Sequence, residues 1–130
     1  EHTDPINEIT SVCTPDDITK LQQQADDVYI DDLVKKYIVE LANATRIHPE
    51  AALGVSPRAS INLMKGGKAY PLLQERDYVV PDDIKAIATA TLAHRVLITP
   101  SARMREVTQE TVIADVLNQV SVPGASVRRS

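Results

Sequence analysis

Apolar residues recur at steps of three and four through much of this chain, which is the spacing of amphipathic helices. The clearest such segment starts after Asp31, whose side chain can cap a helix. It ends near His48, because a residue that precedes proline is disfavoured in the helical region. Its expected inward positions are Val34, Tyr37, Ile38, Leu41 and Thr45.

Two other predicted helices begin with a cap residue followed by proline. Thr14 and Pro15 precede two acids that suit the positive end of a helix dipole, so a helix is expected there. Its apolar face is formed by Ile18, Leu21, Ala25 and Val28. The other helix begins at Ser56 and Pro57 and runs towards Gln74.

The helix that begins at Ser56 contains residues that oppose helical structure. Gly66 and Gly67 each cost about 1 kcal/mol relative to alanine in a helix interior, and Pro71 removes a backbone hydrogen bond. We expect a kinked or interrupted helix; a close contact with another helix is the second explanation for the glycines.

Two further helices are expected nearer the C-terminus. Pro81 and the two acids behind it start a helix. Its inward positions are Ile84, Ile87, Ala88, Thr91 and Leu92. The last helix starts at Thr108, with Val112, Ile113, Val116, Leu117 and Val120 inward. The connection between these two helices, HRVLITPSARMREV, is expected to be irregular.

Extended structure is expected only in traces, at residues 76–80 (RDYVV) and residues 9–13 (ITSVC). Residues 1–13 have the character of a linker, residues 14–122 of a helical domain and residues 123–130 of a flexible C-terminal tail. The predicted fold class is therefore all-α, with about five helices and at most a very short β element.

The composition fits one small domain. The 130 residues can bury a single core, which must be aliphatic because the chain has no Phe or Trp. A net charge of −4 weighs mildly against nucleic-acid binding, since proteins that bind nucleic acids usually have a basic face. The single cysteine, Cys13, indicates a reducing, cytoplasmic setting, and no apolar run approaches the roughly twenty residues that cross a bilayer. The start at Glu1 rather than Met suggests a fragment.

Most of the chemistry that the sequence suggests at first sight fails a closer test. KGGK at 65–68 is not a phosphate loop, because Asn62 stands where glycine is required and Ala69 where Ser or Thr should hold magnesium. His2, His48 and His94 lack the spacing of metal ligands, so no metal site is expected. Three of the four pairs of adjacent acids stand at predicted helix starts, where capping explains them.

Arg58 is a candidate functional residue that these arguments do not explain. It falls in the first turn of the helix that Ser56 and Pro57 begin. A cation there interacts unfavourably with the helix dipole, at a cost of about 0.3–1 kcal/mol in stability. One explanation is a solvated arginine, or one paired with an acid such as Glu50. The other is an anion site, above all for phosphate, in which the free amides of a helix start act together with the guanidinium. The residues alone leave both explanations open.

Four motifs between residues 44 and 100 carry a family resemblance: ATRIHP, GVSPRA, RDYVVPDDIKA and LAHRVLITP. In this order and spacing they closely resemble the C-terminal helical lid of the MoxR family of AAA+ ATPases, and a weaker likeness extends over roughly residues 14–124. The resemblance implies a lid-type helical bundle that closes over a nucleotide. By motif position, Arg58 is then the sensor arginine, with Ser56 and Pro57 forming the start of its helix.

The resemblance also implies that the residues for ATP hydrolysis lie in a separate domain. The phosphate loop and catalytic acids would lie in an AAA+ core, so the parent protein would hydrolyse ATP with Mg²⁺, whereas this fragment alone would be inactive and bind neither. Implied partners are the core of the same chain, the neighbouring subunits of a hexameric ring, and proteins with von Willebrand factor A domains. The implied activity is chaperone-like remodelling or maturation of client complexes.

Two departures from the family pattern affect geometry. The family usually has small helix-favouring residues where Gly66, Gly67 and Pro71 stand, and a capping threonine where Val80 stands.

An alternative from another class is a free-standing, histone-fold-like module for interaction or DNA binding, because RDYVV and the PDDI helix start resemble that fold. A further alternative, the lid of a magnesium-chelatase-like AAA+ subunit, differs only in its client.

Overall fold

The computed structural model describes residues 4–124, and the predicted all-α class is confirmed there. The helices of this part are α1 (Pro15–Asp27), α2 (Asp32–Ile47), α3 (Pro57–Ala69), α4 (Pro81–Leu92), α5 (Pro100–Met104) and α6 (Gln109–Gln119). Strands β1 (Ala51–Leu53) and β2 (Leu97–Ile98) form one antiparallel pair. Short 3-10 helices span Pro5–Glu8 (η1), Tyr70–Gln74 (η2) and Ala93–Arg95 (η3). Residues 1–3 of the predicted linker and 125–130 of the predicted tail lie outside the described residues.

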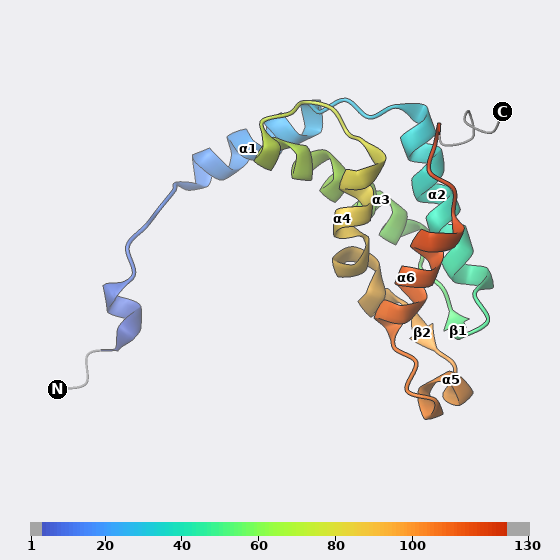
Figure 1. Cartoon of the computed structure of the whole chain (residues 1–130). Coiled ribbons are helices and arrows are strands. Elements are labelled where there is room, and N and C mark those ends of the chain that lie inside the picture. Colours follow the sequence, from blue (N-terminus) through green and yellow to red (C-terminus); the bar gives the residue numbers. More distant parts are fainter. Residues whose placement is uncertain (1–3, 125–130) are drawn as a thin grey trace.

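Helix α2 packs against α3, α4 and α6 in the body of the molecule (Figure 1). All five positions predicted to face inward from α2 are buried, and Tyr37 and Leu41 have no exposed surface. Leu63 of α3, Ile84 of α4 and Ile113 of α6 are other large side chains of this core. Burying each large aliphatic side chain stabilises the fold by roughly 1.5–3 kcal/mol, so the core forms without Phe or Trp.

Side-chain caps mark the starts of three helices where the sequence predicted them. Thr14 and Asp17 exchange two hydrogen bonds in a capping box at the start of α1. The Asp31 carboxylate accepts the Leu33 N–H at 2.8 Å at the start of α2, and Thr108 caps α6. These contacts satisfy amides that have no partner within the helix.

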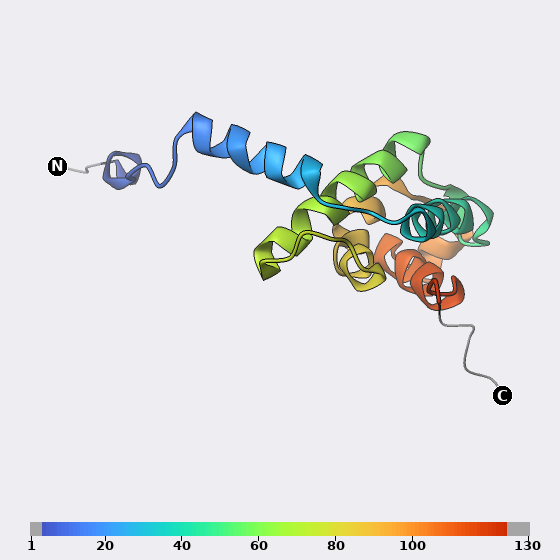
Figure 2. The same cartoon turned by 90° about the horizontal axis from the view of Figure 1, so that it is seen from above.

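Helix α1 extends away from the body, and its environment corrects one prediction (Figure 2). The predicted inward face is not covered, because Ile18 is 45% exposed and Leu21 is 53% exposed. Only Val28, which follows the helix, is buried. The Lys68 ammonium donates to the Asp26 carbonyl and thereby ties the end of α1 to α3. An amphipathic pattern defines an apolar face, but it does not supply the element that covers that face.

Helix α4 begins without a side-chain cap on Val80, as expected, and an ion pair stabilises its start instead. Asp83 Oδ2 accepts the Val80 N–H at 2.7 Å, and the Arg76 guanidinium donates to both carboxylate oxygens at 2.7 Å. Burial of Asp83, which is 2% exposed, would by itself raise the pKa of the carboxyl group. The hydrogen bonds from Arg76 and Val80 outweigh burial, so this pKa lies below its usual value.

The predicted interruption of the helix that begins at Ser56 is present, but it does not lie at Gly66 and Gly67. Helix α3 continues through both glycines to Ala69, and the interruption comes at Pro71 in η2. The second explanation, close helix contact, holds: a Cβ on Gly67 would collide with Cδ1 of Ile84 in α4. One on Gly66 would lie 2.8 Å from the Cδ1 of Ile87, which α4 also carries.

Gly67→Ala is expected to lower the free energy of unfolding by about 1–2 kcal/mol, although alanine favours a helix by about 1 kcal/mol. The added methyl meets Cδ1 of Ile84, whose side chain is fully buried. Ile84→Val removes that atom, so the cost of Gly67→Ala should fall in the Ile84→Val background. Urea denaturation of the four proteins measures this coupling; equal costs in both backgrounds would show that packing is not the cause.

Strand β2 and helix α5 lie within the connection that was expected to be irregular, and β1 lies between the predicted helix end near His48 and the predicted helix start at Ser56. Ala51 pairs with Ile98 and Leu53 with Leu97, with an irregularity between the two pairs. The expected β traces are not strands: residues 9–13 have no regular structure, and Tyr78 makes a single bridge to Tyr29. Elements of two to five residues are too short for hydrophobic periodicity to reveal them.

Candidate functional site

Arg58 lies in the first turn of α3, at an exposed helix start. Ser56 precedes the helix in an extended conformation (φ −77°, ψ 164°), and Pro57 is its first residue. The Ser56 side chain makes no capping hydrogen bond, so the predicted serine cap is wrong. Since residues 56–58 are all exposed, the positive end of the helix dipole and the guanidinium face solvent together.

Glu50, the acid suggested as an alternative partner for Arg58, forms an ion pair with Arg105 instead. The Arg105 guanidinium donates to Glu50 Oε1 at 3.0 Å and to Oε2 at 2.6 Å. Chiefly through this hydrogen bond, Arg105 holds the pKa of Glu50 below its usual value. The guanidinium of Arg58 makes no hydrogen bond or ion pair with residues 4–124. Pro57 has no N–H and the Ala59 N–H donates to the Ser56 carbonyl, so the guanidinium and the N–H of Arg58 are the donors that this turn can offer to a phosphate.

The loop before α3 is held by the last turn of α2. Thr45 Oγ1 accepts the Val55 N–H at 3.0 Å, and the Arg46 Nε–H donates to the Val55 carbonyl at 2.9 Å. Gly54 lies so close to α2 that a Cβ there would be 2.5 Å from Cα of Arg46 and 2.7 Å from the carbonyl carbon of Thr45. The ATRIHP and GVSPRA motifs therefore contact each other, and together they place the start of α3.

His48 is a structural residue at the end of α2. Its Nδ1 accepts the Glu50 N–H at 3.1 Å, which leaves Nε2 to carry the proton and donate to Asp115 of α6 at 3.2 Å. The residue is 7% exposed. The imidazole therefore links α2 to α6 and leaves no nitrogen free for a metal ion.

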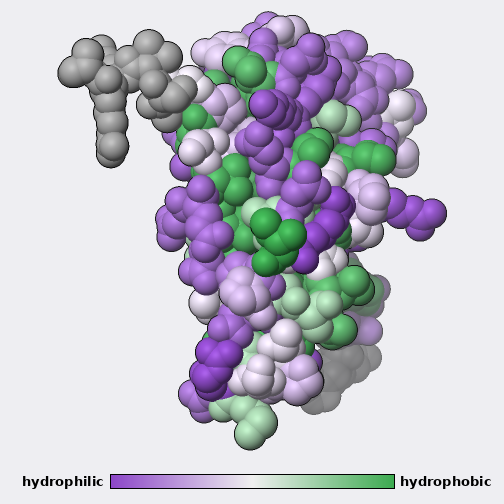
Figure 3. Space-filling model, turned by 90° about the vertical axis from the view of Figure 1, so that its right-hand side faces the viewer, coloured by the Kyte–Doolittle hydropathy of each residue, from purple (hydrophilic) through white to green (hydrophobic). Residues whose placement is uncertain are grey.

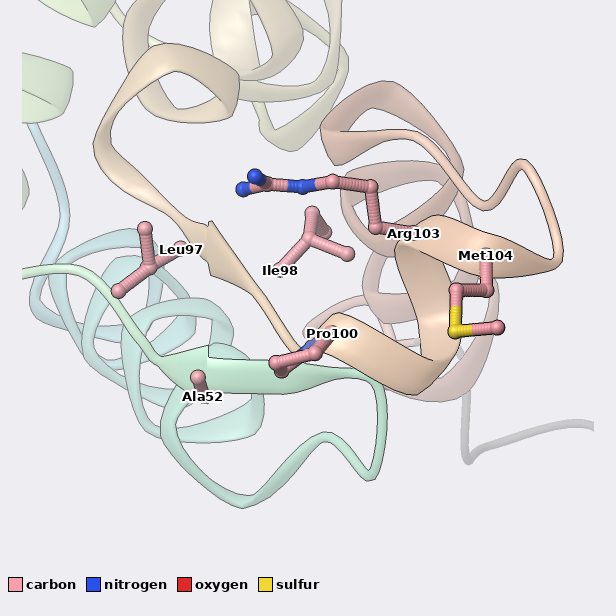
Figure 4. Close-up of a pocket in the computed structure, with 6 residues that line it drawn as sticks. All are labelled: Ala52, Leu97, Ile98, Pro100, Arg103 and Met104. Atoms are coloured by element: carbon pink, nitrogen blue, oxygen red, sulfur yellow. The ribbon is translucent and has the colours of Figure 1, made fainter.

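A hollow of about 520 Å³ lies beside the strand pair (Figure 4). Its lining residues are Ala52, Leu97, Ile98, Pro100, Arg103 and Met104. Arg103 extends over Ile98 and is the single charged residue of this lining, which therefore holds no acid–base pair or nucleophile.

Apolar side chains also reach the surface around this hollow. Figure 3 shows hydrophobic groups between hydrophilic ones on the right-hand face of the molecule. Leu53 is 65% exposed and Met104 is 87% exposed. Contiguous exposed apolar surface marks sites that contact another protein, a membrane or a ligand.

In residues 4–124, no three His, Cys, Asp or Glu side chains gather to hold a metal ion. In the same range, no helix has the length and the apolar character needed to cross a bilayer. The site consists of Arg58, the start of α3 and the contacts that place them.

Thr45 and Arg46 were missed as supports of this site by the sequence analysis. The sequence pattern predicted only that Thr45 faces the core, and it predicted no role for Arg46. The signal that could have indicated them is their place in the ATRIHP motif, which precedes GVSPRA by only a few residues.

Comparison with known proteins identifies relatives of this chain. Residues 43–116 match the family model of the AAA lid domain. The chain is 43% identical over 123 residues to the uncharacterized protein YeaC of Bacillus subtilis, covering 95% of this chain and 38% of that protein. It is 32% identical over 117 residues to the chaperone MoxR1 of Mycobacterium tuberculosis, covering 82% of this chain and 31% of that protein.

The crystal structure of a putative ATPase from Cytophaga hutchinsonii has a similar fold. It superposes with a TM-score of 0.79 at 31% identity, covering 82% of this chain and 35% of that chain. The chain thus spans well under half the length of each of these relatives.

The chain belongs to the AAA lid domain family. More particularly, it is a lid domain of the MoxR type of AAA+ ATPase, because MoxR proteins and the ATPase structure match over most of its length.

Proposed function

We propose that this lid contributes Arg58 to the nucleotide site of its parent protein and passes the change from ATP to ADP on as lid movement. The observation that carries the proposal is the exposed guanidinium at the uncapped start of α3. Phosphate is the anion for which such a site is best suited. Because residues 43–116 match the AAA lid domain family, we prefer this proposal to the histone-fold-like alternative.

Arg58 can distinguish the two nucleotides by charge. A guanidinium that reaches the terminal phosphate of ATP makes charge-assisted hydrogen bonds there that ADP cannot accept. A ligand shifts a conformational equilibrium only by the difference in its affinity for the two states. ATP therefore favours the closed lid, and hydrolysis releases that preference.

The remaining parts of the ATPase belong to the proposed AAA+ core. The 130 residues contain no phosphate loop, and residues 4–124 gather no carboxylates for Mg²⁺. The residues present fit the phosphate end of ATP but not the metal ion. We expect the core to bind ATP and Mg²⁺ and to hydrolyse ATP, and the isolated lid to be inactive.

The proposed partners follow from the family. The lid would contact the core of its own chain and neighbouring subunits of a hexameric ring in the cytoplasm. Its movement would then drive chaperone-like remodelling or maturation of client complexes, together with von Willebrand factor A domain proteins.

Arg58→Ala in the full-length protein is expected to lower kcat/KM for ATP by roughly 10- to 100-fold, the range that corresponds to losing one hydrogen bond to a charged group. Lys65→Ala is the matched control, because it removes an exposed cation from the same helix. Steady-state turnover measures both. If the two variants behave alike, Arg58 has no sensor role.

A further inference from the structure

We propose that Arg46 is a positioning residue for Arg58: by holding the carbonyl of Val55, it fixes where α3 begins and so where the backbone of the sensor arginine lies. The functional half of this inference rests on the proposed role of Arg58. The structural half concerns the loop alone and can be tested separately.

The side chain of Arg46 is oriented by two hydrogen bonds from one planar group. Its Nε donates to the Val55 carbonyl at 2.9 Å, and its Nη1 donates to Asn43 Oδ1 at 2.8 Å. Asn43 lies one turn earlier on the same helix, so the guanidinium is braced against α2 while it holds the loop. A lysine has a single nitrogen and cannot reproduce this geometry.

Thr45 holds the other polar group of Val55. Its hydroxyl accepts the Val55 N–H at 3.0 Å and donates to the Ala42 carbonyl at 2.7 Å, and Thr45 has no exposed surface. Consecutive residues of α2 thus bind both the N–H and the C=O of Val55. A residue held at both polar groups has little freedom to rotate.

The backbone between Val55 and Arg58 has little conformational freedom. Ser56 and Pro57 are the only residues between them, and the ring of Pro57 fixes its φ angle. On the other side of Arg58, Ala59 is completely buried. This backbone path therefore sets where the Cα and Cβ of Arg58 lie, and small misplacements of a positioned group reduce catalysis strongly.

The structural half is tested by hydrogen exchange of the chain described here. Arg46→Met removes the guanidinium but keeps an unbranched side chain, and it should speed exchange of the Val55 and Ala59 amides by roughly tenfold, the effect of losing a hydrogen bond from a charged group. Lys65→Met, which also removes a charge, should leave both rates unchanged, and Arg46→Lys should restore them only in part. Unchanged rates in Arg46→Met would overturn the inference.

The functional half is tested by a double-mutant cycle in the full-length protein. Arg46→Met should weaken ATP binding several-fold when Arg58 is present and should have no further effect in the Arg58→Ala background. A merely structural role would weaken binding equally in both backgrounds, and that result would overturn the inference. If Arg58→Ala itself leaves ATP binding unchanged, the proposed sensor function fails, and the exchange rates still decide whether Arg46 positions the loop.

Discussion

Asp83→Ala is expected to lower the free energy of unfolding by about 3 kcal/mol, the lower end of the range for breaking a buried ion pair. The substitution leaves the Arg76 guanidinium, whose side chain is 17% exposed, without its carboxylate. It also removes the acceptor of the Val80 N–H at the start of α4. Urea denaturation at pH 7 measures the loss.

Asp82→Ala provides the matched control, because Asp82 is exposed and adjacent at the same helix start. It removes the same charge from the helix dipole and should cost less than about 1 kcal/mol. A similar loss in both variants would show that the dipole, and not the ion pair with Arg76, stabilises the start of α4.

The contribution of Asp83 should depend on pH in one direction. Its pKa is lower in the folded chain than in the unfolded chain, so its stabilising effect is complete above the unfolded value of about 4. The effect is lost as the pH falls through the folded pKa. The stability difference between wild type and Asp83→Ala should therefore be constant from about pH 7 to 5 and shrink below about pH 4; a difference that grows in acid would contradict this assignment.

Gly54→Ala is expected to lower the free energy of unfolding by about 3 kcal/mol, at the upper end of the usual cost of overpacking. The added Cβ would lie 2.5 Å from the Cα and N of Arg46, and these backbone atoms cannot rotate away as a side chain can. Relief requires the loop to move off α2, which would strain both hydrogen bonds to Val55. Thermal or urea denaturation measures the loss of stability.

Gly66→Ala is the control for the glycine substitution. Its Cβ would meet only the end of the half-buried Ile87 side chain, so a small adjustment of that side chain and the better helix propensity of alanine should nearly cancel. We expect a change within about 1 kcal/mol. A loss as large as that of Gly54→Ala would mean that any substitution of these glycines is disruptive, irrespective of the neighbouring atoms.

The long helices could be predicted because local signals agree with each other. Asp31 caps α2, and the positions predicted to face inward from that helix are buried. The exposed face of α1 could not be predicted, because burial depends on which element packs against Ile18 and Leu21. The effect of Gly67 likewise depends on Ile84, which lies on a different helix.

The candidate site was only partly predictable for a similar reason. Arg58 could be found because a cation in the first turn of a helix opposes the local electrostatics. Its supports could not, since Thr45 and Arg46 bind backbone atoms of a residue nine or ten positions away. Asp83 shows the same limit: its position at a helix start explained its presence, but its ion pair with Arg76 required the fold.

The central claim is that Arg58 senses the terminal phosphate of ATP. The most direct test is the ratio of ATP to ADP affinity of the full-length protein, measured by equilibrium binding for the wild type, Arg58→Ala and the control Lys65→Ala. Loss of Arg58 should weaken ATP binding by roughly 10- to 100-fold and leave ADP binding nearly unchanged, so the preference for ATP falls, whereas Lys65→Ala should keep it. An unchanged ratio in Arg58→Ala would contradict the claim.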